Sequence, residues 1–312
     1  MQKLTLHAVT AIGHSAGVSA GSIRQPPSHL LPSIAVALCG AMWGVFWLPM
    51  RWFDSEGVGG AWVSVIFNAL ALLSALPFLL KRGAWRGFAD QSVNGLLLGT
   101  AFSLYTVSLV LTDVVHAILL FYLTPVWSTL AAWILFGERM GGRRILSIAL
   151  GFGGLAAILG GADMLPVPRN SGDWIALVSG MCWAAGSLRS FRRPSDGIAL
   201  PVFSFALGGV VSSLLILAVA AGMGLQLVQV GNLAAMLPWI AALGCIVFVP
   251  PNFLVLWAAQ RMDPGRVGIL LMTEVLFGAI SAALLSGEPY GTGDVIGTAL
   301  IVSAGFIEVT KR

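Results

Sequence analysis

The chain has 312 residues, of which 57% are hydrophobic and only 10% are charged, and its mean hydropathy is +0.90. Because about a quarter of the residues of a soluble domain are charged, this composition excludes a soluble globular fold and indicates an integral membrane protein. The net charge of +4 is not accompanied by an aromatic-interleaved basic patch or a recognition motif, so we expect no nucleic-acid partner.

Residues 1–30 differ in composition from the rest of the chain. Thr and His interrupt their weakly apolar stretch, and the segment is rich in Ser and Gly and contains Gln25, Pro26 and Pro27. A secretory signal peptide carries a continuous apolar core. A flexible cytoplasmic tail is therefore the preferred interpretation, and a cleaved signal peptide is the alternative.

From residue 31 onward, the charges are clustered and leave apolar runs of about the 20 residues that a transmembrane helix needs. The runs lack the alternation of a lipid-facing strand, so we expect an all-α integral membrane protein. The boundary between the seventh and eighth runs rests only on polar residues within 222–232. The ten expected helices are 31–50, 61–80, 91–112, 114–136, 145–161, 174–188, 200–223, 237–260, 267–286 and 291–307.

The positions of Lys and Arg predict the orientation of these helices. With the N-terminus inside, 15 of the 17 basic residues fall in inner segments, and only Arg51 and Arg169 fall in outer ones. Positive charge near the ends of membrane spans stays on the cytoplasmic side. We therefore expect a multi-pass protein of the inner (plasma) membrane with both termini in the cytoplasm.

The second half of the chain repeats the first. Residues 113–155 align with 263–305 at an offset of 150 without a gap, and Trp43 aligns with Trp183 at an offset of 140. Each repeat has five helices, an odd number, so the second copy is expected to be inverted in the membrane. Inverted repeats allow a transporter to open alternately to either side. The expected parts are a first repeat over 31–161, a linker over 162–172 and an inverted repeat over 173–309.

Two motifs in each half resemble those of a known family. The first half has the run 120–126 (Leu-Phe-Tyr-Leu-Thr-Pro-Val) followed by Gly137-Glu138-Arg139, and the second has 268–274 followed by Gly287-Glu288. These motifs resemble the ten-helix EamA-type exporters of the drug/metabolite transporter superfamily, over residues 31–309. The resemblance implies export of amino acids or related metabolites through a cavity lined by helices 1, 3, 4, 6, 8 and 9.

Glu274 is the one acid in the interior of a predicted helix. An ionised carboxylate at that depth costs about 2.5–3.5 kcal/mol on insertion scales, so it must be protonated, hydrogen-bonded or exposed to a wet cavity. One hypothesis is a proton-coupling or substrate-amine site. The other is a neutral Glu that bonds to the backbone of a neighbouring helix.

Three prolines interrupt predicted helices. Pro250 and Pro251 remove two backbone donors in mid-span and free the carbonyls of residues 246 and 247, beside Asn252. Unpaired backbone at that depth needs protein partners or a wet cavity, so we expect a helix break that meets substrate, with an internally satisfied kink as the alternative. Pro125 frees the Phe121 carbonyl in the same way and is the weaker candidate for gating.

Several aromatic residues lie deep in the predicted helices. An aromatic cavity suited to apolar or cationic substrates is one interpretation, and packing between helices is the other. Trp43 and Trp183, as repeat mates, favour the cavity. The candidate cavity residues are Trp43, Tyr105, Tyr122, Thr124, Trp127, Trp183, Asn252 and Glu274.

The sequence contains no paired acids, metal-ligand spacing or phosphate-binding loop, so we expect no catalytic residue, metal or cofactor. The predicted function is export of amino acids or related small neutral or zwitterionic metabolites by alternating access. The alternatives are export of drug-like or cationic compounds by the same fold, or a non-transporting membrane enzyme or scaffold. The expected partners are a small-molecule substrate, the lipid bilayer and possible coupling protons, with the chain a monomer or weak homodimer.

Overall fold

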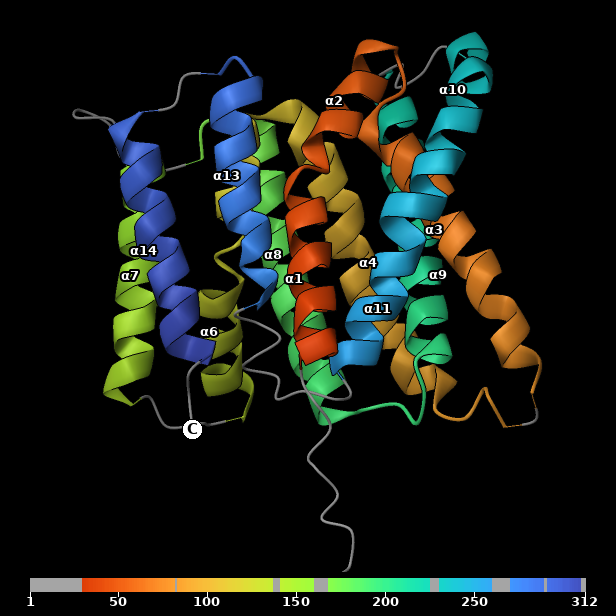
Figure 1. The fold of residues 1–312 in the computed structure, drawn as a ribbon, viewed down its shortest axis with the longest axis horizontal. Helices are drawn as coiled ribbons and strands as arrows, with labels where there is room; N and C mark the ends of the chain where they lie inside the picture. Colours follow the sequence, from red (N-terminus) through yellow and green to blue (C-terminus); the bar gives the residue numbers. More distant parts are fainter. Residues whose placement is uncertain are drawn as a thin grey trace, which may run out of the picture.

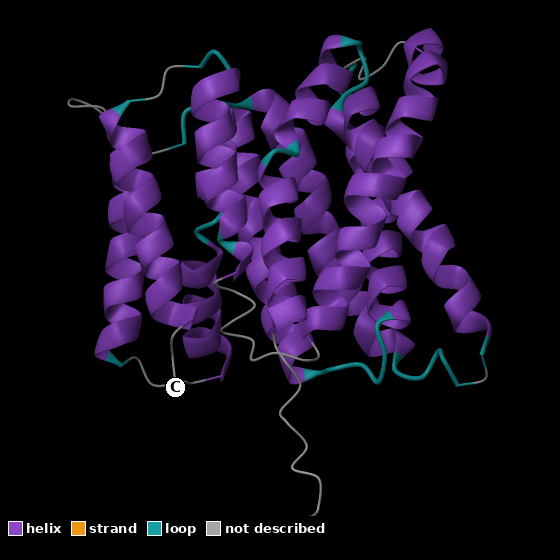
Figure 2. Cartoon of the chain, viewed as in Figure 1, coloured by secondary structure: helices purple, strands orange, loops and turns teal. Residues whose placement is uncertain are grey.

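The computed structural model describes residues 30–81, 83–136, 141–159, 168–224, 230–259, 270–288 and 291–309. Within these ranges the chain is all-helical and contains no β-strand (Figure 2). The expected fold class is therefore confirmed. Residues 1–29 of the expected 1–30 tail, residues 162–167 of the expected linker and the Gly137-Glu138-Arg139 motif lie outside the described residues.

The helices stand side by side (Figure 1). In the first half they are α1 (Leu30–Gly44), α2 (Trp47–Ser55), α3 (Gly60–Ala75) with a 3-10 turn (Leu76–Leu80), α4 (Phe88–Leu111), α5 (Val114–Phe121), α6 (Thr124–Phe136) and α7 (Gly142–Leu159). In the second half they are α8 (Ser171–Arg192), α9 (Ala199–Gly222), α10 (Val230–Leu243), a π-helix η2 (Gly244–Phe248), α11 (Val249–Ala259), α13 (Thr273–Leu285) and α14 (Thr292–Val309).

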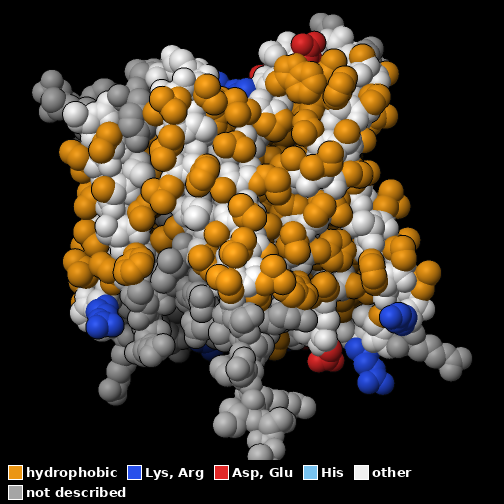
Figure 3. Space-filling model, viewed as in Figure 1, with side chains coloured by type: hydrophobic (Ala, Val, Ile, Leu, Met, Phe, Trp, Pro, Cys, Tyr) orange, Lys and Arg blue, Asp and Glu red, His pale blue; other side chains and the backbone are white. Residues whose placement is uncertain are grey.

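The surface and helix lengths fit a lipid environment. Hydrophobic side chains cover the middle of the visible face, and Lys and Arg lie mostly near its lower edge (Figure 3). Five helical stretches of the described chain are long and apolar enough to cross a bilayer: 30–55, 60–80, 88–111, 199–222 and 232–255. Of the other described helices, most are shorter, and α8, with 22 residues, is less apolar, so the count of ten spans stays a prediction.

The fourth helix of the first repeat is broken, and a turn lies at the matching place in the second. The structure divides the expected span 114–136 into α5 and α6 at a turn over Tyr122 and Leu123, and α13 follows a turn at Met272. Tyr122 and Met272 are equivalent at the offset of 150 residues. Pro125 explains the first break, because proline lacks a backbone donor and fits the first turn of a helix. Nothing in the sequence explains the turn at Met272.

The main contacts between the two halves keep their pattern when the halves are exchanged. The first helix of each half packs on the third and fourth helices of the other: α1 on α11 and α13, and α8 on α4 and α5. The pairs α3 with α9 and α7 with α14 match themselves. Small residues allow such close approach: a Cβ at Gly95 would overlap the carbonyl of Ser204 in α9. The halves are therefore related by an approximate two-fold axis.

The two halves run in opposite directions through the molecule. The first turn of α1 and the last turn of α14 lie at the same end, whereas α8, the counterpart of α1, starts at the opposite end (Figure 1). This arrangement is the inverted repeat that the odd helix number predicts. It brings the mid-helix residues of both halves together at the centre of the molecule.

Candidate functional site

A cavity of about 190 Å³ lies between the two halves of the chain. The fourteen lining residues are Trp43, Phe46, Phe102, Tyr105, Phe121, Tyr122 and Thr124 from the first half, and Trp183, Phe205, Phe248, Asn252, Leu271, Met272 and Glu274 from the second. Each half thus contributes seven residues. Both helix turns, at Tyr122 and at Met272, open onto this space.

The structure brings seven of the eight candidate cavity residues together around this cavity. Trp127 is the exception: it lies outside the lining, with its ring 6.0 Å from that of Phe152. Its indole nitrogen is buried without a hydrogen-bond partner among the described residues. Depth alone predicted Trp127, and depth does not tell which side of a helix a residue occupies.

Glu274 lies in the first turn of α13 and is only 7% exposed. The Tyr122 hydroxyl donates a hydrogen bond of 2.6 Å to its Oε2 atom. A carboxylate in the first turn of a helix is also stabilised by the helix dipole. The carboxyl therefore has a side-chain partner from the other half of the molecule and borders the cavity. The bond joins the turn of one repeat directly to that of the other.

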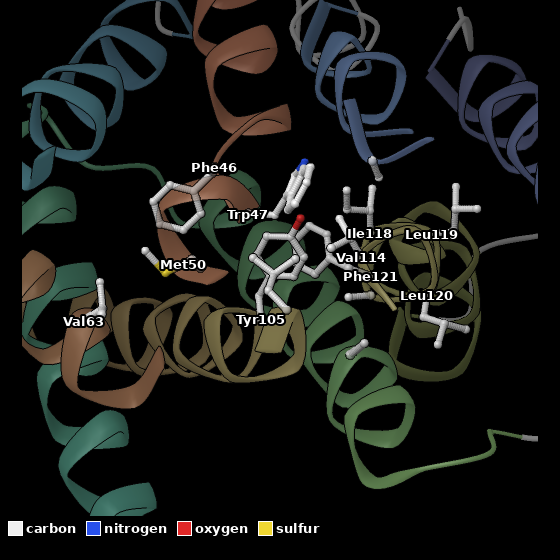
Figure 4. Close-up of a cluster of buried hydrophobic side chains, with 14 of the residues drawn as sticks. Phe46, Trp47, Met50, Val63, Tyr105, Val114, Ile118, Leu119, Leu120 and Phe121 are labelled. Atoms are coloured by element: carbon white, nitrogen blue, oxygen red, sulfur yellow. The ribbon is translucent and has the colours of Figure 1, made fainter. Parts of the chain in front are cut away.

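Aromatic rings form most of the remaining wall. The Phe121 ring lies 5.8 Å from that of Trp183, 4.7 Å from that of Tyr105 and 5.4 Å from that of Tyr122. Figure 4 shows Tyr105 and Phe121 side by side, next to Trp47. Sequence reasoning missed the five lining phenylalanines (Phe46, Phe102, Phe121, Phe205 and Phe248) because a mid-span Phe facing a cavity looks the same in sequence as one facing lipid.

The double proline lies just after a local change of helix type. The π-helix η2 ends at Phe248, two residues before Pro250, and such wide turns accommodate missing backbone bonds. The Asn252 amide donates to the Phe248 carbonyl at 2.7 Å. Asn252 therefore caps the backbone beside the prolines and also lines the cavity.

A similar hydrogen bond from a side chain to a backbone carbonyl occurs next to Pro125, whose own side chain lies outside the described part. The Thr124 hydroxyl donates to the Phe121 carbonyl at 2.7 Å, and this is the carbonyl that Pro125 was expected to free. In both halves, a polar residue of the cavity lining thus donates a hydrogen bond to a backbone carbonyl near a proline. As candidate gating residues, Pro125, Pro250 and Pro251 stay predictions.

The site has the chemistry of a binding cavity. Within the described ranges, no group of three His, Cys, Asp or Glu side chains is placed to hold a metal ion. The lining offers one carboxyl, a few neutral polar groups and many aromatic faces. Such a wall can bind and orient a small molecule that carries a positive group and an apolar body.

Comparisons with known proteins agree with this architecture. The chain is 30% identical over 235 residues to an uncharacterized protein of Pseudomonas aeruginosa, covering 72% of this chain and 74% of the relative. It is 27% identical over 203 residues to an uncharacterized transporter of Methanothermobacter thermautotrophicus, covering 63% of this chain and 57% of the relative. A solved crystal structure of a protein with 17% identity covers 91% of this chain and 96% of its own, with a TM-score of 0.55, and shows the same fold.

The family comparison covers both halves of the chain. The model of the EamA-like transporter family matches residues 30–160 and again residues 170–309, which together make up most of the sequence. The two matches reproduce the two-repeat architecture of that family. The chain therefore belongs to the EamA-like transporter family.

Proposed function

We propose that this transporter exports small amine-bearing metabolites from the cytoplasm by alternating access, with amino acids and related neutral or zwitterionic molecules as the substrate class. The observation that carries the proposal is the cavity between two inverted halves, with the Glu274 carboxyl set in an aromatic wall. A site at the interface of inverted repeats opens to either side as one half rocks against the other.

The cavity favours a small metabolite over a large drug-like compound. Its volume of about 190 Å³ is below the roughly 300–1,000 Å³ of pockets for drug-sized ligands. The substrate ammonium group would face Glu274, and its apolar part would lie among Trp43, Trp183 and the phenylalanines. A cation over an aromatic face gains about 0.5–2 kcal/mol, with the larger values in sites without water.

The proposed location is the inner membrane with both ends of the chain in the cytoplasm. The beginning of α1 and the end of α14 share one end of the molecule (Figure 1). The connections with Lys81, Arg86 and Arg193 lie at that same end, as the retention of positive charge on the cytoplasmic side requires. Export then means release at the end that carries Arg51 and Glu288.

Glu274 is also the proposed site of proton coupling. Its carboxyl is buried, faces the cavity and pairs with Tyr122 from the opposite half. An ammonium and a proton would compete for the same carboxyl, so that one leaves as the other binds. With a zwitterionic substrate, the inward proton carries the net charge, and a charge that crosses the full membrane potential changes the free energy by about 2.3 kcal/mol per 100 mV. Exchange of one proton for one organic cation moves no net charge and is driven by the pH difference alone.

Counterflow in proteoliposomes tests the proposed transport. Vesicles with the purified full chain, preloaded with unlabelled amino acids, should accumulate the matching labelled amino acid transiently above the level of empty liposomes. Glu274→Ala should abolish this signal. Glu56→Gln, at an exposed position just after α2, should keep it. No exchange of any amino acid or amine above the empty-liposome level would refute the proposal.

A further inference from the structure

The charge of the cavity wall has one sign. Among the fourteen described lining residues, Glu274 is the one that carries a charged group, and it is acidic. An organic cation therefore finds a counter-ion in this site. The carboxylate of a zwitterion would enter the same small space as the Glu274 carboxyl and would lose its water there, which is costly for a charge that gains no partner.

The hydrogen-bonding groups of the wall point to the same ligand. The Tyr122 hydroxyl donates to Glu274, the Thr124 hydroxyl to the Phe121 carbonyl and the Asn252 amide to the Phe248 carbonyl. With these donors engaged, the Tyr122 and Thr124 hydroxyls offer a ligand acceptor oxygen atoms, and the Asn252 amide offers its oxygen and one further N–H. Acceptors suit an ammonium group, which only donates, and they do not suit a carboxylate, which only accepts.

Neutral donors remain in the aromatic side chains of Trp43, Tyr105 and Trp183, which also line the cavity. A carboxylate bonded to them would still lack a positive partner among the described lining residues. The same rings present their faces to an ammonium group, and a cation gains more from such faces when water is excluded. These aromatic side chains thus attract a cation, and they provide no positive partner for a carboxylate.

We propose that the cavity selects organic monocations, amines on an apolar body without a carboxylate, over the corresponding zwitterionic amino acids. This inference rests on the proposed transport of amine-bearing molecules by alternating access, and it departs from the proposed substrate class by ranking amines above the zwitterionic amino acids. The preference is carried by the Glu274 carboxyl together with the aromatic wall around it.

Matched ligand pairs test the preference. Isothermal titration of the detergent-purified full chain at neutral pH compares phenethylamine with phenylalanine, and 3-methylbutylamine with leucine, because each pair differs by one carboxylate. We expect the amine of each pair to bind at least about tenfold more tightly, a difference of about 1.4 kcal/mol. Benzyltrimethylammonium, which is permanently charged and does not leak through lipid, serves as the substrate in proteoliposome counterflow and should be exchanged.

Two variants with matched controls assign the preference to the wall. Glu274→Gln should reduce the amine preference several-fold, and Glu56→Gln should retain it. Trp183→Leu should weaken binding of benzyltrimethylammonium, and Trp133→Leu, at an exposed position of α6, should leave it unchanged. The Trp183 comparison keeps the test valid if Glu274→Gln does not fold.

The outcomes separate this inference from the proposed function. Equal or tighter binding of the amino acids, with counterflow of amino acids intact, would overturn the cation preference and leave the transport function standing. A tenfold preference that survives in both Glu274→Gln and Trp183→Leu would also overturn it, because another part of the molecule would then carry the selectivity. Absence of binding and of counterflow for all ligands would overturn both.

Discussion

Arg51 and Glu288 form an ion pair of 2.7 Å that joins the two halves of the chain at the end remote from the basic connections. Arg51 also donates to the carbonyls of Leu109 and Thr112, and Glu288 accepts from the backbone N–H of Val114. The side chains of Arg51 and Glu288 and the backbone groups of Leu109, Thr112 and Val114 form one hydrogen-bonded cluster, here called the clamp. This clamp therefore holds the end of α13 against the α4–α5 connection.

A second bond across the halves lies nearer the cavity than the clamp. The Trp47 indole donates to the Ser281 hydroxyl at 2.9 Å, and both side chains are buried. Close packing supports this bond, because a Cβ at Gly44 would crowd the backbone of Gly278 at 2.8 Å. These contacts hold α1 and α2 against α13 on the side of the cavity that faces this end.

Weakening the clamp should favour the conformation that is open at this end. Glu288→Gln removes the charge but keeps the shape, so it loses charge-assisted bonds that are worth about 1.5–3 kcal/mol each. A loss of about 1.4 kcal/mol already shifts an equilibrium between two conformations tenfold. We expect at least a several-fold increase in access to the cavity from this end.

Cysteine labelling measures that access. The reporter is Met272→Cys, a cavity position, in a chain whose Cys39, Cys182 and Cys245 are replaced by Ala. An impermeant thiol reagent added on the Arg51 side should label it faster in Glu288→Gln than in the parent. Asp90→Asn, which breaks the Asp90–Arg189 pair at the opposite end, is the control and should not speed labelling from this side. Equal rates in the parent and in Glu288→Gln would show that the clamp does not hold this end closed.

Removing the double proline should make the third helix of the second half more regular. Pro250→Ala with Pro251→Ala restores two backbone N–H donors. The helix can then form regular backbone hydrogen bonds in place of the π-helix and of the bond from Asn252 to the Phe248 carbonyl. We expect a folded protein whose counterflow falls several-fold, because the cavity wall near Asn252 is displaced. The measurement is initial counterflow rate together with thermal stability in detergent. Unchanged counterflow would mean that the break serves packing alone.

Glu274→Gln should separate exchange from proton coupling. Gln keeps the size of the side chain and can still bond to Tyr122, but it cannot release a proton. If the carboxyl couples transport to protons, the variant still exchanges substrate down its gradient. An imposed pH difference then no longer stimulates its transport. The comparison is uptake with and without a pH gradient in the same vesicles. A parent protein that is itself indifferent to the gradient would show a passive facilitator.

Much of the fold could be predicted because the physical signals are local or repeated. Apolar runs and clustered charges located the helices. The offset of 140 residues predicted that α1 corresponds to α8, and the offset of 150 residues predicted that α5 and α6 correspond to the region of α13, and α7 to α14. Pro125 marks the break next to Tyr122, but the turn at Met272 was missed because it lies inside a continuously apolar run. Hydropathy averages over such runs and carries no information on where the backbone turns.

The site was predictable where the chemistry was unusual for its depth. Glu274 and Asn252 stand out because polar side chains are rare in mid-span, and both line the cavity. The phenylalanines of the wall carry no such signal. The sequence identified Arg51 only as a basic residue of an outer segment and Glu288 only as part of a motif. Their ion pair was missed because it joins positions 237 residues apart.

Alternating access requires that one cavity residue can be reached from each side of the membrane in turn. In proteoliposomes that hold the cysteine-substituted chain with Met272→Cys, an impermeant thiol reagent is applied separately inside and outside. We expect labelling from both sides, a change in the ratio of the two rates when substrate is added, and no leak of small ions through the vesicles. Labelling from one side alone, unaffected by substrate, would contradict alternating access through this cavity.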